Sequence, residues 1–456
     1  MTPPPTTRRR FLRAAGTLSV AAVAGCLSDS SDGSDGEEMP TATGVGDKIP
    51  YDVGVQHDLT AWNQYDSDWA APKTAPEPGS YEAEILAENL EIPWDIAFAP
   101  NGELFVTERT GRVVTVEQNG YKTVSEPESV VDAEALPPGS EEDSWYVEGG
   151  EGGLLGIAVH PNYPDVPLVY TYFTTKSDDE RINRVAAFDT SSDDSWTIVD
   201  NIPGDSYHNG GRLTFGPENY LWVTAGDGDP ALDNPEAIAD PGTLGGKILR
   251  LEPDGAAPQD NPDIGPDADP RVFTYGHRNP QGVAWFPDGT PIIAEHGPGG
   301  GDEVNVLRPG GNYGWPKARN SDGFESYKGT DYQRPVASAS SWAPSGCLFY
   351  TGDSIPSLQG RLIVAGLISQ QLIAFTITRD GSRLTTDHEH RHAADWMDND
   401  YHAASTPLLS DELGRIRHVE QGPDGGLYAT TSNRDGRAGD GFPTERDDKL
   451  VRIRPN

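Results

Sequence analysis

The chain has 456 residues and a formal net charge of −38, because 72 acidic residues outnumber 34 Lys and Arg residues. A surface this acidic repels phosphate backbones and anionic lipid headgroups, so nucleic acid is excluded as a partner. Only 23% of the residues are charged, so the imbalance comes from few cations and predicts a halophilic protein that stays soluble in high salt. A calcium-buffering protein is the alternative, but the acids are not grouped in EF-hand loops.

The N-terminal residues have the pattern of an export signal. TRRRFLR, residues 7–13, precedes a small apolar stretch, and together they resemble a twin-arginine signal that is too short to remain as a membrane-spanning helix. The stretch ends in VAGC, which resembles a lipobox with Cys26 as the acylated cysteine. We therefore predict a lipoprotein signal over residues 1–26, a flexible acidic Ser/Asp/Gly tether over 27–47, and a lipid anchor on the outer face of the cell membrane.

One pattern recurs along the chain after an irregular segment at residues 48–80. It consists of an apolar strand, a proline-containing turn and a second apolar strand, which is the pattern of a β-hairpin. The turn prolines are about 60 residues apart, within reach of the longer propeller repeats. Six copies predict an all-β, six-bladed β-propeller with four-stranded blades over residues 81–456, and a pair of β-sandwiches is the competing fold. The copies begin at Ile92, Leu154, Gly211, Asn279, Ser345 and Arg415.

The two ends of this region support a closed ring. YEAEILAENL, which starts at Tyr81, and KLVRIRP at the C-terminus both alternate like strands. A closed ring needs no free sheet edge between its ends. We therefore expect the strand at one end to complete the blade formed by the other.

Polar motifs stand next to the apolar strands of the repeats. In a propeller the innermost strand of each blade lines the central channel, so these motifs should converge at one end of it. A histidine beside a carboxylate can act as a general base, arginines can hold an anionic ligand, and Gly-rich loops can offer carbonyls to Ca²⁺. The pattern predicts a site for a planar polyanion with a base beside it. The motifs are GEGGLLG (150–156), HNGGRL (208–213), TAGDGD (224–229), GHRN (276–279), EHGPGGGDE (295–303) and GRIRH (414–418).

Several of these motifs occur in the order found in a known enzyme family. GHRNPQG, EHGPGGGDE, GGNYGWP and HNGGRL followed by TAGD resemble soluble quinoprotein glucose dehydrogenases and the related aldose sugar dehydrogenases, over residues 88–454. That family consists of six-bladed propellers that use pyrroloquinoline quinone (PQQ) and Ca²⁺. The resemblance implies an extracellular oxidoreductase that oxidises an aldose to a lactone by hydride transfer to the quinone and passes electrons to a respiratory acceptor.

The resemblance also implies a role for each matching residue. His208 would take the proton of the anomeric hydroxyl, Asp227 would orient and charge-stabilise His208, and Arg278 would stabilise the reduced cofactor. The other implied roles are cofactor contacts by Glu151, Arg278, Asn279, Arg415 and Arg417, a Ca²⁺ bound by the carbonyls of Gly297 and Pro298, and a second, structural Ca²⁺ at Glu303 and Tyr313.

One departure from the family affects the expected substrate. Glucose dehydrogenases carry a cofactor-contacting lysine where this chain has Ile368, in GLISQQL, and the loops that shape the sugar pocket are shorter. This favours the aldose-dehydrogenase branch. The alternative function is a catalytically silent propeller that acts as an extracellular sugar-binding or interaction module, although such a module has no need of the His208–Asp227 couple. A Ca²⁺-dependent lactonase fits less well, because its acids and asparagines centre on the metal.

Other residues allow structural interpretations. Arg415 and Arg417 alternate on one side of a strand, so a salt-bridge pair between blades is as good an interpretation as a carboxylate clamp. If Cys26 carries lipid, no disulfide is available, and Cys347 is expected to be a small buried hydrophobe. The three histidines of DHEHRH, residues 387–392, lack a defined fourth ligand and are expected to be a solvated insertion.

Overall fold

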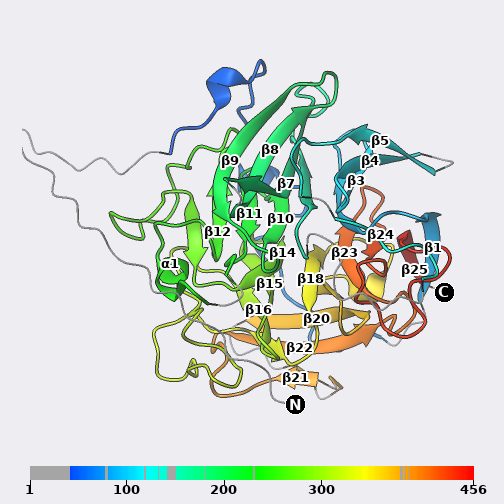
Figure 1. Ribbon diagram of the computed structural model, residues 1–456. Helices are drawn as coiled ribbons and strands as arrows, with labels where there is room; N and C mark the ends of the chain where they lie inside the picture. The colour runs from blue at the N-terminus through cyan, green and yellow to red at the C-terminus, as the bar shows by residue number, and fades with distance from the viewer. Residues whose placement is uncertain are drawn as a thin grey trace, which may run out of the picture. The chain divides into compact units, whose positions relative to one another are not determined.

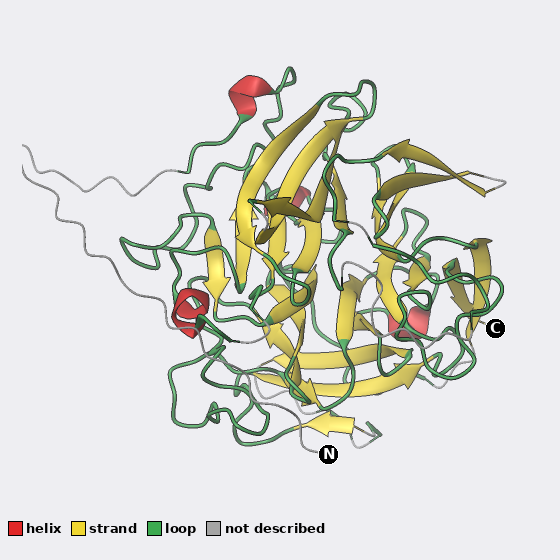
Figure 2. Ribbon diagram, viewed as in Figure 1, coloured by secondary structure: helices red, strands yellow, loops and turns green. Residues whose placement is uncertain are grey.

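Six antiparallel sheets, one for each sequence repeat, form the part of the chain that the computed structural model describes (Figures 1 and 2). The described residues belong to one compact unit. The predicted signal, Cys26 and most of the tether lie outside them. The described ranges are 42–77, 81–117, 120–131, 133–140, 150–178, 180–229, 232–379, 384–385, 387–388 and 390–455.

The sheets are the blades of a six-bladed β-propeller, and each inner strand starts within one residue of the start predicted from the repeat. The alternating apolar residues of each strand pack between neighbouring blades. From the innermost strand outward, the blades are β2 (Pro93–Phe98), β3 (Leu104–Glu108), β4 (Arg112–Glu117) and β5 (Gly120–Ser125); β6 (Leu154–Val159), β7 (Leu168–Ser177), β8 (Glu180–Asp189) and β9 (Ser195–Pro203); β10 (Gly210–Phe215), β11 (Leu221–Ala225), β12 (Lys247–Leu251) and β13 (Val272–Tyr275); β14 (Asn279–Trp285), β15 (Pro291–His296), β16 (Asp302–Val306) and β17 (Ala337–Ala339); β18 (Pro344–Tyr350), β19 (Arg361–Gly366), β20 (Gln371–Arg379), β22 (Tyr401–Leu408) and β21 (His390–His392); and β23 (Ile416–Gln421), β24 (Leu427–Thr431), β25 (Leu450–Pro455) and β1 (Tyr81–Ala87).

The ring closes as the sequence predicts. Strand β1 pairs antiparallel with β25, from Tyr81 opposite Pro455 to Ala87 opposite Leu450, and so becomes the outermost strand of the last blade. The last blade therefore contains both ends of the propeller, and in Figure 1 its blue and red strands lie side by side.

The inner strands β2, β6, β10, β14, β18 and β23 contact one another in a ring around a central channel. Their approach is close: a Cβ on Gly156 of β6 would lie 2.2 Å from the carbonyl oxygen of Gly211 in β10, so only glycine fits there. All six inner strands start at one end of this channel and finish at the other. We call these the entry end and the far end.

The fifth blade differs from the prediction, because it has five strands instead of four. The extra edge strand, β21, comes from DHEHRH. His390 and Arg391 are exposed, as expected for a solvated insertion, but the motif forms a strand and one of its histidines is buried. His388 is buried and its Nε2 lies 3.1 Å from the Lys73 carbonyl oxygen, while His392 Nε2 lies 3.1 Å from Ser405 Oγ. Burial lowers the pKa of His392 to about 4, so it is neutral at pH 7. Cys347 is buried and free, as expected.

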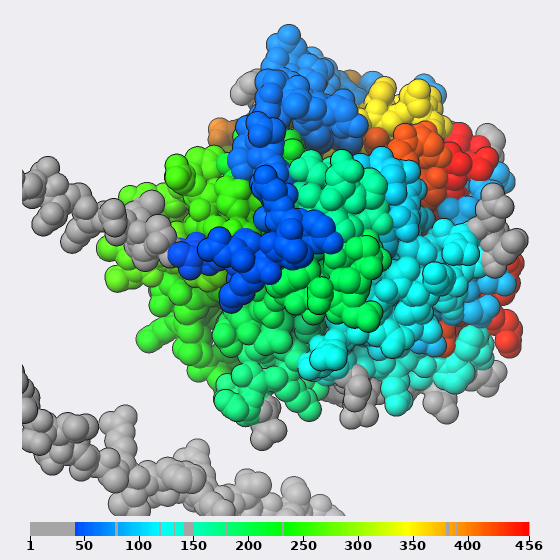
Figure 3. Space-filling view, turned by 90° about the horizontal axis from the view of Figure 1, so that it is seen from above, coloured from blue at the N-terminus to red at the C-terminus, as the bar shows by residue number. Residues whose placement is uncertain are grey.

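Residues 42–77, which we call the strap, cross the far end of the propeller as the blue band of Figure 3. Within the strap, Tyr51 Oη donates to Asp189 Oδ2 (2.5 Å), and the backbone N–H of Asp66 donates to the Pro287 carbonyl (2.9 Å). The strap thereby joins several blades. No helix in the described ranges is long and apolar enough to span a membrane. The helices there are short: η1 (Gly46–Lys48), η2 (Leu59–Ala61), α1 (Pro235–Ala239) and η3 (Pro356–Leu358).

Candidate active site

A histidine–carboxylate pair stands at the entry end, where β10 begins. His208 Nδ1 lies 2.9 Å from Oδ1 of Asp227, which follows β11. His208 has a φ of 59°, and its backbone N–H donates to Glu151 Oε2 at 3.1 Å, which holds this unfavourable conformation. Because Nδ1 faces the carboxylate, Nε2 is the nitrogen left to accept a substrate proton. The fold thus brings three of the predicted residues together around a potential general base.

The second oxygen of Asp227 also has a partner. Trp315 Nε1 donates to Oδ2 at 2.9 Å, and the backbone N–H of Asp229 donates to Oδ1 at 3.2 Å. Asp227 is only 2% exposed, and these donors replace the water that a buried carboxylate loses. Trp315 belongs to GGNYGWP, but no sequence pattern predicted that it contacts Asp227.

Glu151 bridges two blades. Its Oε1 accepts from Arg437 Nη1 at 2.7 Å, while its Oε2 accepts from the His208 backbone. Burial alone would raise the pKa of Glu151, but the Arg437 guanidinium outweighs burial and holds this pKa well below its usual range. Glu151 is therefore charged, and in this structure it positions His208.

Arg278 and Asn279 lie at the start of β14. The backbone N–H of Arg278 donates to Glu295 Oε1 at 2.6 Å, and its Nη1 lies 3.4 Å from the His296 carbonyl oxygen. Burial lowers the pKa of Arg278. Asn279 Oδ1 accepts from the Gly210 backbone at 3.0 Å, which ties the starts of two inner strands together. Part of the Arg278 guanidinium is thus left for a ligand, whereas the Asn279 oxygen already has a donor.

Arg415 and Arg417 share one carboxylate. Arg415 Nε and Nη2 donate to Asp435 Oδ2 at 3.1 and 3.0 Å, and Arg417 Nη2 lies 3.5 Å from the same oxygen. Asp435 follows β24 in the same blade, so the interpretation as a salt-bridge pair between blades is wrong. Arg417 also reaches the β14 side chain Gln281, whose Oε1 accepts from Nη1 at 3.1 Å. Burial lowers the pKa of Arg417 to about 9.

Arg109 was not predicted from the sequence. It follows β3, is buried, and donates from Nε to the Gly152 carbonyl (3.1 Å) and from Nη2 to the Gly150 carbonyl. Burial lowers the pKa of Arg109 to about 10, and the nearby charges include those of Asp435 and Arg437. No motif marks Arg109, because its partners lie more than 40 residues away along the chain.

Positive charge exceeds negative charge at this site, although the whole chain is strongly acidic. Three buried nitrogens have no hydrogen-bond partner there: Arg278 Nε, Arg417 Nε and His296 Nε2. Burial lowers the pKa of His296 to about 3, so it is neutral. Buried donors without partners are costly unless a ligand or water satisfies them, and surplus cations select an anion. The cations are Arg109, Arg278, Arg415, Arg417 and Arg437, the acids are Glu151, Asp227 and Asp435, and the neighbouring ion pair of Arg319 with Glu295 adds no net charge.

The predicted metal ligands Gly297 and Pro298 lie in the loop between β15 and β16. The Gly297 backbone N–H donates to Asp302 Oδ1 at 2.9 Å, and Ser321 Oγ donates to the Pro298 carbonyl at 2.9 Å. Within the described ranges, no group of three or more His, Cys, Asp or Glu side chains could hold a metal ion. A cation here would depend on backbone carbonyls and on atoms of a bound ligand.

Glu303 and Tyr313 both have protein partners. Glu303 forms a buried ion pair with Arg319 and accepts from Tyr327 Oη at 2.9 Å. Burial and the neighbouring Glu295 raise the pKa of Glu303 to about 7, against the pull of Arg319. Tyr313 Oη donates to the Val306 carbonyl at 2.7 Å. Tyr327 Oη also lies 3.4 Å from the Tyr313 carbonyl oxygen, so this carbonyl and the Glu303 carboxylate share one neighbour. The structural Ca²⁺ at Glu303 and Tyr313 stays a prediction.

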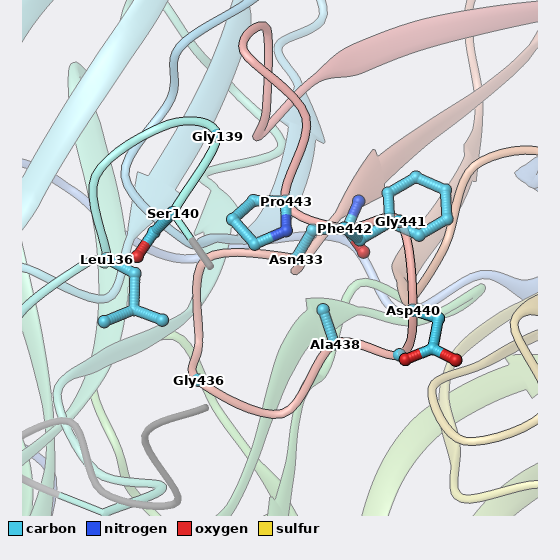
Figure 4. Close-up of a pocket in the computed structure, with 11 residues that line it drawn as sticks. Leu136, Gly139, Ser140, Asn433, Gly436, Ala438, Asp440, Gly441, Phe442 and Pro443 are labelled. Carbon is cyan, nitrogen blue, oxygen red and sulfur yellow. The ribbon is translucent and has the colours of Figure 1, made fainter. Parts of the chain in front are cut away.

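A cleft of about 610 Å³ opens beside these arginines (Figure 4). It lies between the loop after β5 and the loop from β24 to β25, which also carries Asp435 and Arg437. In Figure 4 the two loops face each other across the cleft. The residues that line it are Leu136, Gly139, Ser140, Asn433, Gly436, Ala438, Gly439, Asp440, Gly441, Phe442 and Pro443.

Ile368 lies in the turn between β19 and β20, at the entry end. Its side chain is unusually exposed for isoleucine, at 63%. A Cβ on Gly439 would lie 2.6 Å from Gln370 Nε2, which places this turn next to the lip of the cleft. The position where the family carries a lysine therefore lies in a turn beside the cleft.

Comparisons with known proteins identify the family of this chain. A family model described as Glucose / Sorbosone dehydrogenase matches residues 90–440. Aldose sugar dehydrogenase YliI of Escherichia coli is 30% identical over 388 residues, 81% of this chain and 93% of that protein, and quinoprotein glucose dehydrogenase B of Acinetobacter calcoaceticus is 32% identical over 57% of each chain. The structure of the PQQ-bound aldose sugar dehydrogenase of Streptomyces coelicolor has 30% identity and a TM-score of 0.64 over 85% of this chain and all of that chain. The chain belongs to the glucose/sorbosone dehydrogenase family.

Proposed function

We propose that this protein is a PQQ-dependent dehydrogenase that oxidises aldose sugars to lactones. The observation that carries the proposal is the His208–Asp227 couple beside a buried, arginine-rich region with unpartnered donors. A base and an anion-binding region in one place are what the oxidation of an anomeric hydroxyl by an anionic quinone requires. The names of the aldose dehydrogenase and quinoprotein relatives support the same activity.

The side chains at the entry end fit PQQ. PQQ is a planar tricarboxylate, and the surplus guanidinium groups can pair with carboxylates in bidentate geometry. Arg278, Arg415 and Arg417 would hold the cofactor, with the free Nε atoms of Arg278 and Arg417 as donors to it. When bound, PQQ supplies a two-electron acceptor for the hydride of the sugar. We assign Glu151 and Asn279 to the walls of this pocket, since their oxygens already accept backbone hydrogens.

The residues of this chain would handle the proton. His208 Nε2 would accept the anomeric hydroxyl proton as the hydride leaves the same carbon, so the proton and the electron pair depart to different acceptors. The Asp227 carboxylate, 2.9 Å from Nδ1, would stabilise the resulting imidazolium. Arg278 would stabilise negative charge that develops on the reduced cofactor.

We propose Ca²⁺ as the metal of this site, bound by the carbonyl oxygens of Gly297 and Pro298. Carbonyl oxygens are ligands that Ca²⁺ accepts, and a Ca²⁺ beside a quinone would act as a Lewis acid. A Cβ on Gly297 would lie 2.0 Å from the Gly301 carbonyl oxygen, so only glycine fits this tight loop.

The N-terminal sequence supports a proposal for location and electron flow. We propose export by the twin-arginine route, lipidation of Cys26 and transfer of electrons to a respiratory acceptor outside the cell membrane. Cell fractionation tests this directly: the wild type should be found with the membrane, and Cys26→Ser should be released in soluble form. Membrane association that survives Cys26→Ser would contradict the lipid anchor.

The experiment that tests the activity is a PQQ titration of the purified protein in molar salt with Ca²⁺, with dye reduction followed over a panel of aldoses. Reduction should require both PQQ and an aldose and should disappear in His208→Ala. His57→Ala is the matched control, because His57 contacts Glu252 from the strap at the far end. Removal of Ca²⁺ by a chelator should abolish the activity, and added Ca²⁺ should restore it.

Ile368 favours a second candidate function, a silent sugar-binding or interaction module, because the family lysine is absent. PQQ that neither binds nor supports turnover in the folded protein would establish this second function in place of the dehydrogenase.

A further inference from the structure

Trp315 connects two of the groups that the proposed reaction uses. Its Nε1 donates to Asp227 Oδ2 at 2.9 Å, and its ring centroid lies 5.5 Å from the Arg278 guanidinium carbon. The side chain is buried, 3% exposed. It thus contacts the carboxylate that faces the base and the arginine assigned to the cofactor.

The loop that carries Trp315 is fixed to the segment before GHRN. The Trp315 backbone N–H donates to the Gly276 carbonyl at 3.0 Å, and the Tyr313 backbone N–H donates to the Tyr275 carbonyl at 2.9 Å. A Cβ on Gly276 would lie 2.3 Å from Asn312 Oδ1, so the two segments approach too closely for a side chain. The indole is therefore held rigidly relative to Arg278 and Asp227.

The two oxygens of the Asp227 carboxylate have different partners in this arrangement. Oδ1 faces His208 Nδ1, and Oδ2 receives the indole N–H. An indole N–H can only donate, so it fixes the direction of the carboxylate and draws part of its negative charge away from Oδ1. The charge that His208 experiences then depends on Trp315.

We propose that Trp315 is a positioning residue that sets the orientation and charge of Asp227 and thereby the basicity of His208. The inference rests on the proposed function for its effect on turnover, but its effect on His208 is independent of cofactor and substrate. Loss of the indole donor should concentrate charge on Oδ1, stabilise the imidazolium and free the carboxylate to rotate.

The test uses the full-length protein with Trp315→Phe, which keeps an aromatic ring and removes the donor. The matched control is Trp222→Phe, at a buried tryptophan that packs against Phe273 and Trp285. In Trp315→Phe the acid limb of the kcat/KM profile should move to higher pH. Its kcat should fall about ten-fold, as expected for one hydrogen bond to a charged group, with KM little changed. Trp222→Phe should change neither.

Nuclear magnetic resonance of ¹⁵N-labelled histidine, without PQQ, gives a readout that does not depend on activity. The His208 signal, identified by its absence in His208→Gln, should titrate at higher pH in Trp315→Phe than in the wild type. If Trp315→Phe does not fold, wild-type protein labelled with ¹⁵N in tryptophan still tests the proposal: one indole N–H signal should titrate together with His208 and lose that titration in His208→Gln.

An unchanged His208 titration in Trp315→Phe, or a wild type without a coupled indole signal, overturns the proposal. A fall in kcat without the pH shift would show a structural role only. Failure of the proposed function is a different result, since it would leave the wild type without PQQ-dependent aldose oxidation while the resonance experiment still decides on Trp315.

Discussion

The two ends of the central channel both contain a buried histidine, an aspartate and arginine, yet they differ in charge balance. At the entry end, five arginines lie near three carboxylates. Among the described residues, buried nitrogens without a hydrogen-bond partner occur at both ends, for example Arg417 Nε at the entry end and Arg212 Nη2 at the far end. At the far end, Arg212 forms an ion pair with Asp95, and His418 Nε2 lies 3.2 Å from Asp95 Oδ1 and 3.4 Å from Glu420 Oε2. That cluster holds one arginine and two acids, so the surplus there is acidic.

Protonation can neutralise an acidic surplus, but it cannot neutralise arginine. Burial raises the pKa of Asp95 to about 6, and burial together with Asp95 raises the pKa of Glu420 to about 8. The far end can therefore lose its surplus charge by binding protons, whereas the entry end requires an anion. The far end also has a cavity of about 600 Å³, so cavity size does not distinguish the two ends. What distinguishes the two ends is the sign of the charge that has no counter-charge, which is positive at the entry end and negative at the far end.

The largest expected effect is on kcat, and it should distinguish Asp227 at the entry end from Asp95 at the far end. Asp227→Asn should lower kcat by about 10²- to 10⁴-fold, because the imidazolium of His208 loses its counter-charge. Asp95→Asn, the corresponding change at the far end, should lower Tm but keep the wild-type kcat. Dye-reduction kinetics and thermal unfolding of both variants check this. Equal losses of kcat would show that the far end takes part in the reaction.

The next largest effect is on the Kd of PQQ, and it should distinguish Arg417 at the entry end from Arg212 at the far end. Arg417→Met should raise the Kd of PQQ by about 10- to 100-fold, as expected for loss of a charged hydrogen bond to the cofactor. Arg212→Met should leave this Kd unchanged, since Arg212 pairs with Asp95 at the far end. Calorimetric titration with PQQ measures both. A PQQ affinity that is insensitive to Arg417 would move the binding site away from the entry end.

A smaller gain is expected at Ile368. Ile368→Lys adds a cation beside the cleft and should tighten PQQ binding by up to about ten-fold, the value of one favourable charge interaction. Val124→Lys makes a similar change at another exposed apolar residue, on β5, and should have no effect on the Kd. Tighter binding in both variants would show only a general reduction of the net negative charge.

The smallest effect concerns pH and stability. The pKa values of Asp95 and Glu420 lie above their ordinary values of 3.8 and 4.5, so the stability they contribute is present at low pH and is lost as pH rises through about 6 and about 8. Glu420→Gln should therefore flatten the fall in Tm between pH 5 and pH 8, by about 2–4 °C for each kcal/mol involved. Thermal unfolding at constant salt checks this, and a parallel pH dependence in both proteins would refute it.

Much of the fold could be predicted from the sequence because hairpin patterns are local. The repeats predicted the start of each inner strand, and the strand patterns at the two ends predicted the pairing of β1 with β25. The same local logic did not reveal β21, since three residues at the edge of a sheet show too short an alternation.

The sequence predicted only those site residues that belong to recognisable motifs. His208 and Asp227 are 19 residues apart and stand in recognisable motifs, and the structure brings them into contact. Arg437 pairs with Glu151 across 286 residues of chain, a contact that only closure of the ring creates. Glu303 marks a limit of motif reading: its motif predicts a second Ca²⁺, and the sequence did not reveal that Arg319 pairs with its carboxylate.

The pairing of β1 with β25 has a consequence for how the protein matures. The loop that supplies Asp435 and Arg437 lies between β24 and β25, and β25 is held from outside by the first strand of the propeller. Synthesis reaches β25 more than 350 residues after its partner β1. The anion-binding end therefore reaches its final form only after the two termini of the propeller have met. Cofactor loading would report that β1 and β25 have paired.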